Sequence, residues 1–270
     1  IFSIKSNNGQ KDVDLRGGVV TFSYFENLFS PMLTAQVLIT STGNVIEDDK
    51  GELTSIYNGL PLRGGEKVSI KIPPTSDGPG LEFTEDNDNP LFVSSITNVL
   101  IAAESETFVL NLVSREAITN ETMRVGKKFP TSEKISNSVN DILKNYLRIS
   151  DDKINYVEET QNKYGFIGNM KKPFSIITWL SAKSVSGKAK PSEDSSAGYV
   201  FFQSQNGYNF CSIDFLMEQS PFERDFVYTP SVIDSDDPHK NFKILSYGTS
   251  RNQDLIGKLE RGAYSSVRYY

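Results

Sequence analysis

The first part of the chain alternates apolar and polar residues in short runs. Val68, Ile70 and Ile72 alternate with Ser69 and Lys71, which is the period-two pattern of a strand with one buried face. Runs rich in β-branched, aromatic or alternating apolar residues predict strands at 19–25, 32–39, 68–72, 92–100 and 108–112. Gly, Pro, Asn and Asp are frequent in the connections. Many short strands joined by such turns predict an antiparallel barrel or sandwich.

The period of the pattern changes near residue 114. Apolar residues recur at helical spacing over 135–147, which predicts an amphipathic helix. Thr131 or Ser132 is expected to cap its start, with Glu133 in its first turn. A second helix is expected to begin at Pro173, because the fixed φ of proline suits the first helical position. The residues expected to point inward from this helix are Ile176, Ile177 and Leu180.

A hairpin is predicted after the second helix. The runs 199–202 and 208–213 are apolar and aromatic, and Asn206-Gly207 between them is expected to supply the positive φ angles of the turn. A polar linker at 234–239 follows. Beyond it the expected elements are a strand at 242–247, a helix at 250–262 that opens with a capping box, and a strand at 263–270.

These elements predict an α+β fold that is mainly β. We expect an antiparallel tube-type β-barrel domain built from residues 1–115 and 225–270, interrupted by a helix-plus-hairpin insertion domain at 116–224. The chain begins at Ile1 rather than Met, and its end at Tyr270 falls within a strand pattern. We therefore expect it to be part of a longer protein.

Composition narrows the class of protein. The 270 residues carry a formal net charge of −6, which disfavours a general nucleic-acid coat or a lipid-surface binder. A single cysteine excludes an intramolecular disulfide. No apolar run approaches the roughly 20 residues of a membrane helix, and no signal peptide is visible at the start.

Few residues suit catalysis or metal binding. His239 is the only histidine and lies in a polar linker, so a solvated loop residue is expected. Cys211 lies in a predicted strand and is expected to be a buried apolar residue. The acidic groups that could form a catalytic pair are Glu47-Asp48-Asp49, Glu85-Asp86-Asp88, Asp151-Asp152 and Asp234-Asp236-Asp237. All lie in polar loops, where solvated acids are expected rather than a buried acid with a raised pKa.

Other motifs have an ordinary structural interpretation. The run 86–89 is acidic and amide-rich but lacks the spacing of a calcium loop. The glycines of 62–67 precede a strand and predict a tight turn rather than a phosphate loop. The doublets Lys127-Lys128 and Lys171-Lys172 are expected on the surface, and Trp179 is expected to anchor a core or an interface. No catalytic, cofactor-binding or metal-binding residue is assigned.

Several segments together resemble a known family. They are Leu60 to Ile72 (LPLRGGEKVSIKI), Gly198 to Tyr208 (GYVFFQSQNGY), 242–247 and 261–264. With a β-domain that is interrupted and then resumes, the chain resembles the baseplate hub subunit of contractile-tailed (myovirus-type) bacteriophages, in the tube-domain family. The resemblance rests on the pattern and order of the elements.

The resemblance implies a virion structural protein and not an enzyme. Such hubs are homotrimers with two tube-type barrels per subunit, and their pseudo-sixfold ring adapts the sixfold tail tube to the threefold central spike. The implied partners are copies of itself, the spike and tube or tube-initiator proteins. Phage DNA passes through the lumen without specific binding, and no cofactor or membrane insertion is implied. Assembly in the bacterial host cytoplasm into the tail baseplate is expected, with a second tube domain after Tyr270.

Three other interpretations stay open. The chain could be another tail-tube or tube-initiator baseplate protein, although its long insertion disfavours a plain tube subunit. It could be a carbohydrate-binding receptor module, which exposed aromatic stacking residues would support. It could be a tail-associated cell-wall hydrolase, which needs paired buried carboxylates in a cleft. The apolar setting of most Tyr and Phe residues favours a core role for them.

Overall fold

The computed structural model describes most of the chain between Ile1 and residue 243. The described ranges are 1–7, 12–43, 46–47, 51–60, 62–74, 80–102, 105–187, 198–220, 225–228 and 241–243. They belong to two compact units, Ile1–Gln219 and Ser220–Tyr270, which are treated separately below.

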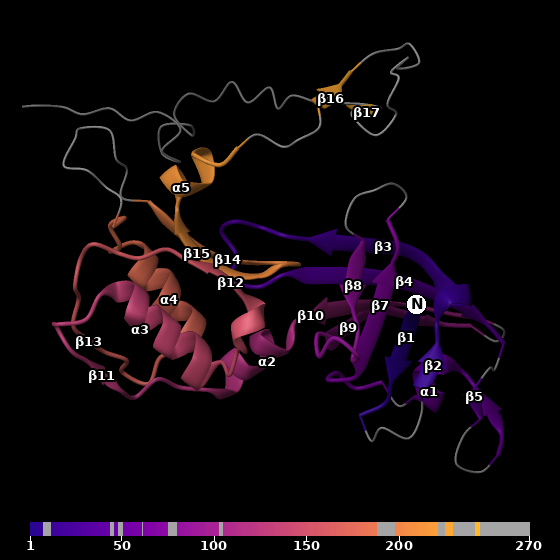
Figure 1. Ribbon diagram of the computed structural model, residues 1–270. Coiled ribbons are helices and arrows are strands. Elements are labelled where there is room, and N and C mark those ends of the chain that lie inside the picture. Colours follow the sequence, from indigo (N-terminus) through magenta and orange to yellow (C-terminus); the bar gives the residue numbers. More distant parts are fainter. Residues whose placement is uncertain are drawn as a thin grey trace, which may run out of the picture. The chain divides into compact units, whose positions relative to one another are not determined.

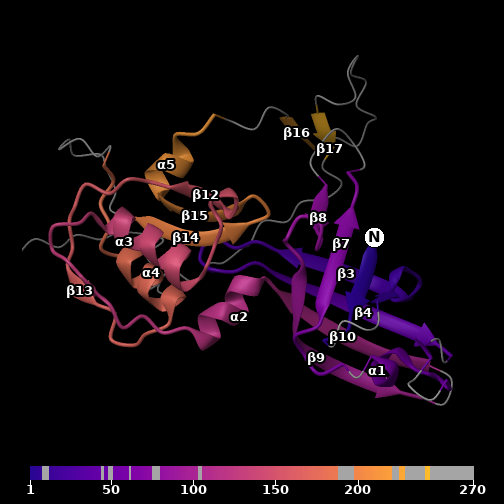
Figure 2. The same cartoon turned by 60° about the horizontal axis from the view of Figure 1, so that its bottom comes forward.

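One antiparallel sheet of eight strands organises the first part of the larger unit (Figures 1 and 2). Its strands, in spatial order, are β2 (Asp12–Asp14), β1 (Phe2–Lys5), β7 (Lys67–Ile72), β9 (Leu91–Ile101), β10 (Ser105–Val113), β4 (Thr34–Thr42) and β3 (Val19–Phe25), with β8 (Leu81–Phe83) paired to β7. All of these pairings are antiparallel. The expected mainly-β α+β fold class is confirmed, as are the strands predicted between residues 19 and 112.

The period-two pattern builds the core of this sheet. Burial alternates along β10, so that Phe108, Leu110 and Leu112 point inward, and the register places them opposite buried residues of β4. The sheet is curled, because the ring of Tyr24 on the terminal strand β3 lies 5.6 Å from that of Phe83 on β8. In the described ranges no hydrogen-bonded pairing joins β3 to β8 or to β2.

Short elements complete this part of the fold. They are η1 (Arg16–Gly18), β5 (Ile46–Glu47), β6 (Leu53–Thr54) and α1 (Ile56–Gly59). The buried carboxylate of Glu106 accepts a 2.7 Å hydrogen bond from the N–H of Ile56 at the start of α1. The expected glycine turn is also confirmed: Gly64 and Gly65 have φ of 97° and 89°, and buried Glu66 accepts from the Gly64 N–H at 2.9 Å.

A second group of elements follows β10. They are α2 (Arg115–Thr122), β11 (Lys128–Phe129), α3 (Ile135–Asp141), the π-turn η2 (Ile142–Tyr146), η3 (Asp151–Lys153), β12 (Ile154–Val157), β13 (Phe166–Ile167), α4 (Pro173–Ser181), β14 (Tyr199–Ser204), β15 (Gly207–Ser212) and α5 (Ile213–Met217). β15 pairs parallel to β12 and antiparallel to β14. α3 and α4 cover one face of this small sheet (Figures 1 and 2). No helix in the described ranges combines the length and the apolar character that a membrane crossing demands.

The start of α3 differs from the expectation. Neither Thr131 nor Ser132 caps the helix, which begins farther along the chain, and Glu133 therefore precedes its first turn. The physical reason is a cap supplied from a distant segment: the N–H of Ser136 donates to the Thr160 hydroxyl at 3.1 Å. A long-range acceptor satisfies the free N–H group, so no local cap is required there.

The start of α4 agrees with the expectation. Pro173 occupies the first turn, and Ile176, Ile177 and Leu180 are buried. The next N–H, that of Phe174, donates to the side-chain oxygen of Asn120 on α2 at 2.8 Å. Pro173 thus has no N–H group that needs an acceptor, and Asn120 on α2 accepts from the N–H of Phe174.

The turn of the β14–β15 hairpin also differs in detail. Ser204 pairs with Gly207, so Gln205 and Asn206 form the turn, and Asn206 does not have the positive φ expected of it. Gly207 alone adopts one, at 118°. A Cβ at Gly207 would lie 2.3 Å from the carbonyl oxygen of Lys153. Glycine is therefore required twice, by its backbone angle and by the close approach of η3.

The smaller unit contains two described strands. β16 (Asp225–Val227) pairs parallel to β17 (Asn241–Lys243). The rest of the strand expected at 242–247, the helix at 250–262 and the final strand lie outside the described residues. Completion of the barrel by 225–270 therefore stays a prediction.

Replacing Gly207 tests the close approach of the hairpin to η3. Gly207→Ala should destabilise the protein by about 2–4 kcal/mol, because the new methyl group clashes with a backbone carbonyl and φ is unfavourable. Gly17→Ala is the matched control, since a Cβ at Gly17 would meet nothing within 4 Å. Urea unfolding should show a lower midpoint for Gly207→Ala only, and equal midpoints would contradict the packing described.

Candidate functional site

The larger unit contains two hydrophobic cores, and polar residues join them. One core is enclosed by the eight-stranded sheet, and the other lies between α3, α4 and the β12–β15–β14 sheet. Met32 and Val113, at the ends of the loop into β4 and of β10, pack against the second core. The side chains between the cores are largely polar, so hydrogen bonds determine how the two parts join.

Gln203 on β14 is the central residue of this junction. Its side chain is 5% exposed, and its Oε1 accepts from the Leu33 N–H at 3.2 Å and from the Ser114 hydroxyl at 3.0 Å. Leu33 precedes β4 and Ser114 follows β10. One amide therefore connects three segments that are distant in the sequence.

A short polar chain continues from Ser114. Its Oγ lies 3.5 Å from the Tyr208 hydroxyl, which donates to Oε2 of Glu116 at 3.4 Å. All three side chains are buried. Burial, together with the negative charge of Glu116, raises the pKa of Tyr208 well above its ordinary value. Tyr208 therefore stays protonated and acts as a hydrogen-bond donor.

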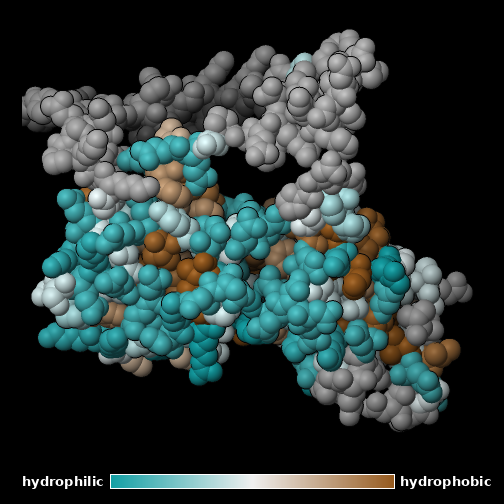
Figure 3. All heavy atoms as spheres, viewed as in Figure 1, coloured by the Kyte–Doolittle hydropathy of each residue, from teal (hydrophilic) through white to brown (hydrophobic). Residues whose placement is uncertain are grey.

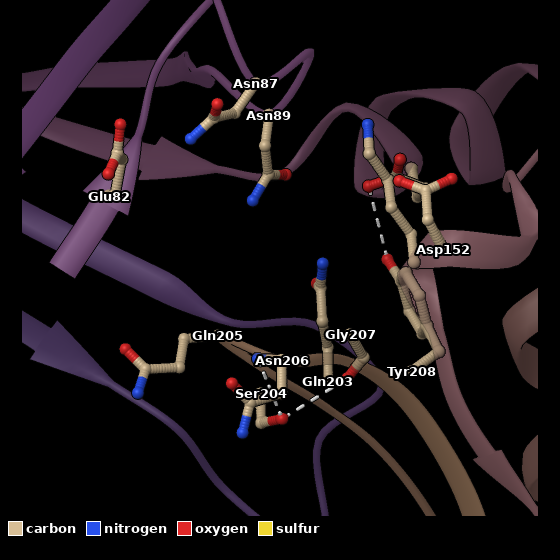
Figure 4. A pocket seen from close by; sticks show the side chains of 12 residues that line it. Glu82, Asn87, Asn89, Asp152, Gln203, Ser204, Gln205, Asn206, Gly207 and Tyr208 are labelled. Atoms are coloured by element: carbon tan, nitrogen blue, oxygen red, sulfur yellow. Dashed lines mark hydrogen bonds between the residues drawn. The ribbon is translucent and has the colours of Figure 1, made fainter. Parts of the chain in front are cut away.

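Gln203, Tyr208 and Glu116 also line a polar cavity of about 230 Å³ (Figure 4). The cavity is lined by Glu82, Asn87, Asn89, Glu116, Asp152, Lys153, Gln203, Ser204, Gln205, Asn206, Gly207 and Tyr208. Asn87 and Asn89 come from the loop between β8 and β9, and the side chain of Asn89 extends toward the β14–β15 hairpin. Five of the lining side chains are primary amides, groups that can both donate and accept hydrogen bonds.

Two ion pairs of Asp88 hold the loop that forms one wall of the cavity. Arg115 on α2 contacts its carboxylate at 2.9 Å, and Lys153 on η3 lies 3.4 Å from it. Hydrogen bonding to Arg115, reinforced by the charge of Lys153, holds the pKa of Asp88 below its usual range. The carboxylate therefore stays ionised near neutral pH and fixes the loop that carries Asn87 and Asn89.

Cys211 is buried in β15, as the sequence predicts. Its side chain is 1% exposed, and burial, with a smaller contribution from the charge of Glu158, raises its pKa to about 12. A thiol must ionise to act as a nucleophile, so Cys211 is held in the unreactive form at neutral pH. His239 lies outside the described residues.

Several of the acidic residues singled out in the sequence form ion pairs with lysine side chains. Glu85 contacts Lys67 at 2.7 Å and Lys5 at 3.0 Å, and these bonds lower its pKa. Asp151 contacts Lys144 at 2.6 Å. A hydrogen bond from Ser150 lowers the pKa of its neighbour Asp152. Asp48, Asp49, Asp234, Asp236 and Asp237 lie outside the described residues.

The possible calcium run does not gather acidic ligands. In the described part of the chain no group of three or more His, Cys, Asp or Glu side chains is placed to hold a metal ion. Within the run 86–89, Asn87 and Asn89 instead line the polar cavity, and Asp88 binds Arg115 and Lys153.

The basic and aromatic residues singled out lie among the elements that follow β10. Lys127 contacts Asp141 at 3.0 Å, and Lys172 binds Glu121. Trp179 is 40% exposed, and its ring meets those of Tyr164 and Phe166 edge-on at 5.6 Å. It belongs to a surface aromatic cluster rather than to the interior. Lys128 and Lys171 are exposed.

Sequence reasoning did not find the cavity. The buried acids that it missed are Glu66, Glu106, Glu116 and Glu158. Gln203 and Tyr208 stand in strand patterns, where a core role is the simplest expectation. Gln203 directly follows the apolar run 199–202, and its burial could not be read from the sequence.

Comparison with known proteins finds similar folds but no similar sequences. No model of a known family matches the chain, and no curated protein matches its sequence. The fold is similar to that of the 43 kDa tail protein of prophage MuSo2 from Shewanella oneidensis, with a TM-score of 0.53, 9% identity, and coverage of 87% of this chain and 60% of that protein.

Two further solved structures align with lower scores. A prophage tail protein, gp18 of Listeria monocytogenes EGD-e, gives a TM-score of 0.41 at 9% identity, covering 86% of this chain and 56% of that one. An Escherichia coli type VI secretion component, described as similar to the T4 tail proteins gp27 and gp5, gives 0.42 at 12%, covering 67% and 42%. The chain thus spans about 60% or less of the length of these proteins. Its mainly-β fold is similar to that of the prophage MuSo2 tail protein.

Removing the central amide tests the junction. Gln203→Leu should destabilise the protein by about 2–4 kcal/mol, because the buried Leu33 N–H and Ser114 hydroxyl lose their acceptor. Gln36→Leu removes a glutamine exposed on β4 that bonds Asn111 at 3.1 Å and should change stability by no more than about 0.5 kcal/mol. Chemical denaturation measures both variants, and an equal loss would contradict the role of Gln203.

The raised pKa of Cys211 predicts that its thiol does not react in the folded protein. At pH 8 a thiol whose pKa is about 12 is almost wholly protonated, so a chromogenic disulfide reagent should react only as the protein unfolds. The same reagent should label the chain at once in denaturing urea, where the thiol regains its ordinary pKa of about 8.5. Rapid labelling of folded protein would contradict the burial of β15.

Proposed function

We propose that the chain is a structural subunit of a phage-type tail, and specifically of the baseplate hub. In this proposal, trimers of the protein form a ring that adapts the sixfold tail tube to the threefold central spike. The partners are further copies of the chain, the spike and tube or tube-initiator proteins, and DNA passes through the lumen. The place of action is the tail baseplate of the virion. The protein acts by assembly and not by catalysis.

The observation that carries the proposal is the fold. The larger unit, a curled antiparallel sheet followed by a helix-and-hairpin region, belongs to a fold similar to that of a prophage tail protein over 87% of this chain. Because fold alone does not fix function, surface and interior features must agree with it.

The surface beside β3 favours self-assembly. β3 ends the hydrogen-bonded path of the sheet, and the exposed fractions of Phe25, Leu28 and Phe29 at its end are 49%, 46% and 83%. In Figure 3 apolar surface also gathers around β3, β7 and β8. An apolar edge strand is a template for pairing with another chain, as the subunits of a closed ring require.

The interior favours a structural role. The carboxylates of Glu66, Glu106 and Glu158 each accept a hydrogen bond from a backbone N–H, at 2.7, 2.7 and 2.6 Å. A buried acid bound in this way holds turns and helix starts in place. These three carboxylates therefore serve the architecture, which supports assembly rather than hydrolysis.

Oligomeric state tests the proposal. Light scattering of the full-length protein should show a homotrimer. Replacing Phe25 and Phe29 together by Asp should shift the trimer to monomer, because charge on the exposed end of β3 opposes its burial between subunits. Met170→Asp, which alters a 63% exposed residue of the inserted domain, is the matched control and should leave the trimer intact.

Two outcomes would contradict the proposal. If the protein is monomeric at every concentration, the proposed trimeric ring is wrong. If the protein hydrolyses purified bacterial cell wall and Glu116→Gln abolishes that activity, the proposal that it does not act by catalysis is wrong.

A further inference from the structure

The side-chain amide of Gln203 has one half that the fold does not use. Oε1 must face the Leu33 N–H, because a backbone N–H can only donate. The orientation of the amide is therefore fixed by the protein, and its NH₂ group is directed away from Leu33. Among the described residues Nε2 has no hydrogen-bond partner, although only 5% of Gln203 is exposed.

Figure 4 shows where that unused donor points. The Gln203 side chain extends into the polar cavity, and Asn89 extends toward it from the opposite wall. The amide of Asn89 likewise bonds to no other described side chain. Both amides line the polar cavity, where oxygen atoms of water or of a ligand can accept hydrogen bonds from their NH₂ groups.

The lining restricts what can supply those oxygens. Glu82, Glu116 and Asp152 disfavour an anion, and the ammonium of Lys153 is already bound to Asp88. The inward-facing NH₂ of Gln203 disfavours a cation. An apolar ligand would strip water from the amides without replacing its hydrogen bonds.

The size of the cavity restricts the ligand further. A volume of about 230 Å³ lies below the range of roughly 300–1,000 Å³ that suits drug-sized ligands. The cavity volume corresponds to that of several water molecules, at about 30 Å³ each. A peptide anchor would also need apolar lining, which this cavity lacks.

We propose that this cavity is a binding site for a small neutral polyhydroxylated ligand, of the size of a single sugar ring. Each hydroxyl both donates and accepts, so its oxygen can accept from Gln203 and Asn89 while its hydrogen is donated to Glu116 or Asp152. The site goes beyond the proposed structural function and does not depend on it. Its position at the junction means that a bound ligand would also strengthen the contact between the two cores.

Nuclear magnetic resonance of the side-chain amides tests the site directly. The probes are glucose, galactose and N-acetylglucosamine, each titrated separately into the full chain, with calcium chloride and inorganic phosphate as separate arms. At least one sugar should shift the Gln203 and Asn89 NH₂ signals saturably. Asn89→Ala should weaken that sugar about tenfold, because it removes a cavity amide that bonds to no other described side chain.

Two further variants make the test specific. Gln203→Glu keeps an oxygen for Leu33 and Ser114 but replaces the inward NH₂ with an acceptor, so it should also weaken the sugar about tenfold or more. Asn145→Ala removes an exposed amide that bonds Asp141 outside the cavity and should have no effect. The proposal is overturned if no sugar shifts these signals, if only calcium or phosphate does, or if Asn89→Ala binds like the wild type.

Discussion

The amide of Gln203 is the contact on which the arrangement of the larger unit depends. The two cores are each held by apolar packing, which is strong but not directional. Their junction is polar, and the geometry there is fixed by an acceptor that serves a backbone N–H before β4 and a hydroxyl after β10. Without that acceptor the buried Leu33 N–H would have no partner, and the Ser114 hydroxyl would keep only its 3.5 Å contact with the Tyr208 hydroxyl.

The same principle recurs throughout the unit. Turns and helix starts are satisfied by side chains that come from elsewhere: Glu106 for α1, Thr160 for α3 and Asn120 for α4. Each connection is worth only about 1–3 kcal/mol, but each fixes a direction that hydrophobic burial leaves free. A subunit that must present fixed surfaces to its neighbours benefits from such connections.

Sequence patterns predicted the local structure where the cause was local. The alternation of 68–72 specified β7, and Pro173 specified the start of α4. The cap of α3 could not be predicted, because its acceptor, Thr160, lies 24 residues away in the chain. The cavity could not be predicted for a similar reason: Asn89 lies in a predicted connection and Gln203 lies just after a predicted strand, and only the tertiary fold brings them together.

The docking of the β14–β15 hairpin also bears on how the chain is made. Gln203 bonds to residues that precede it by 170 and 89 positions, so the eight-stranded sheet must wait until β14 has left the ribosome before the junction can close. Contacts of such long sequence separation form slowly. During synthesis the β3 end and the unfilled polar junction are therefore exposed together, and this interval is when premature association would be most harmful. The order of translation thus makes β14 available to close the junction only after all the strands of the eight-stranded sheet have been synthesised.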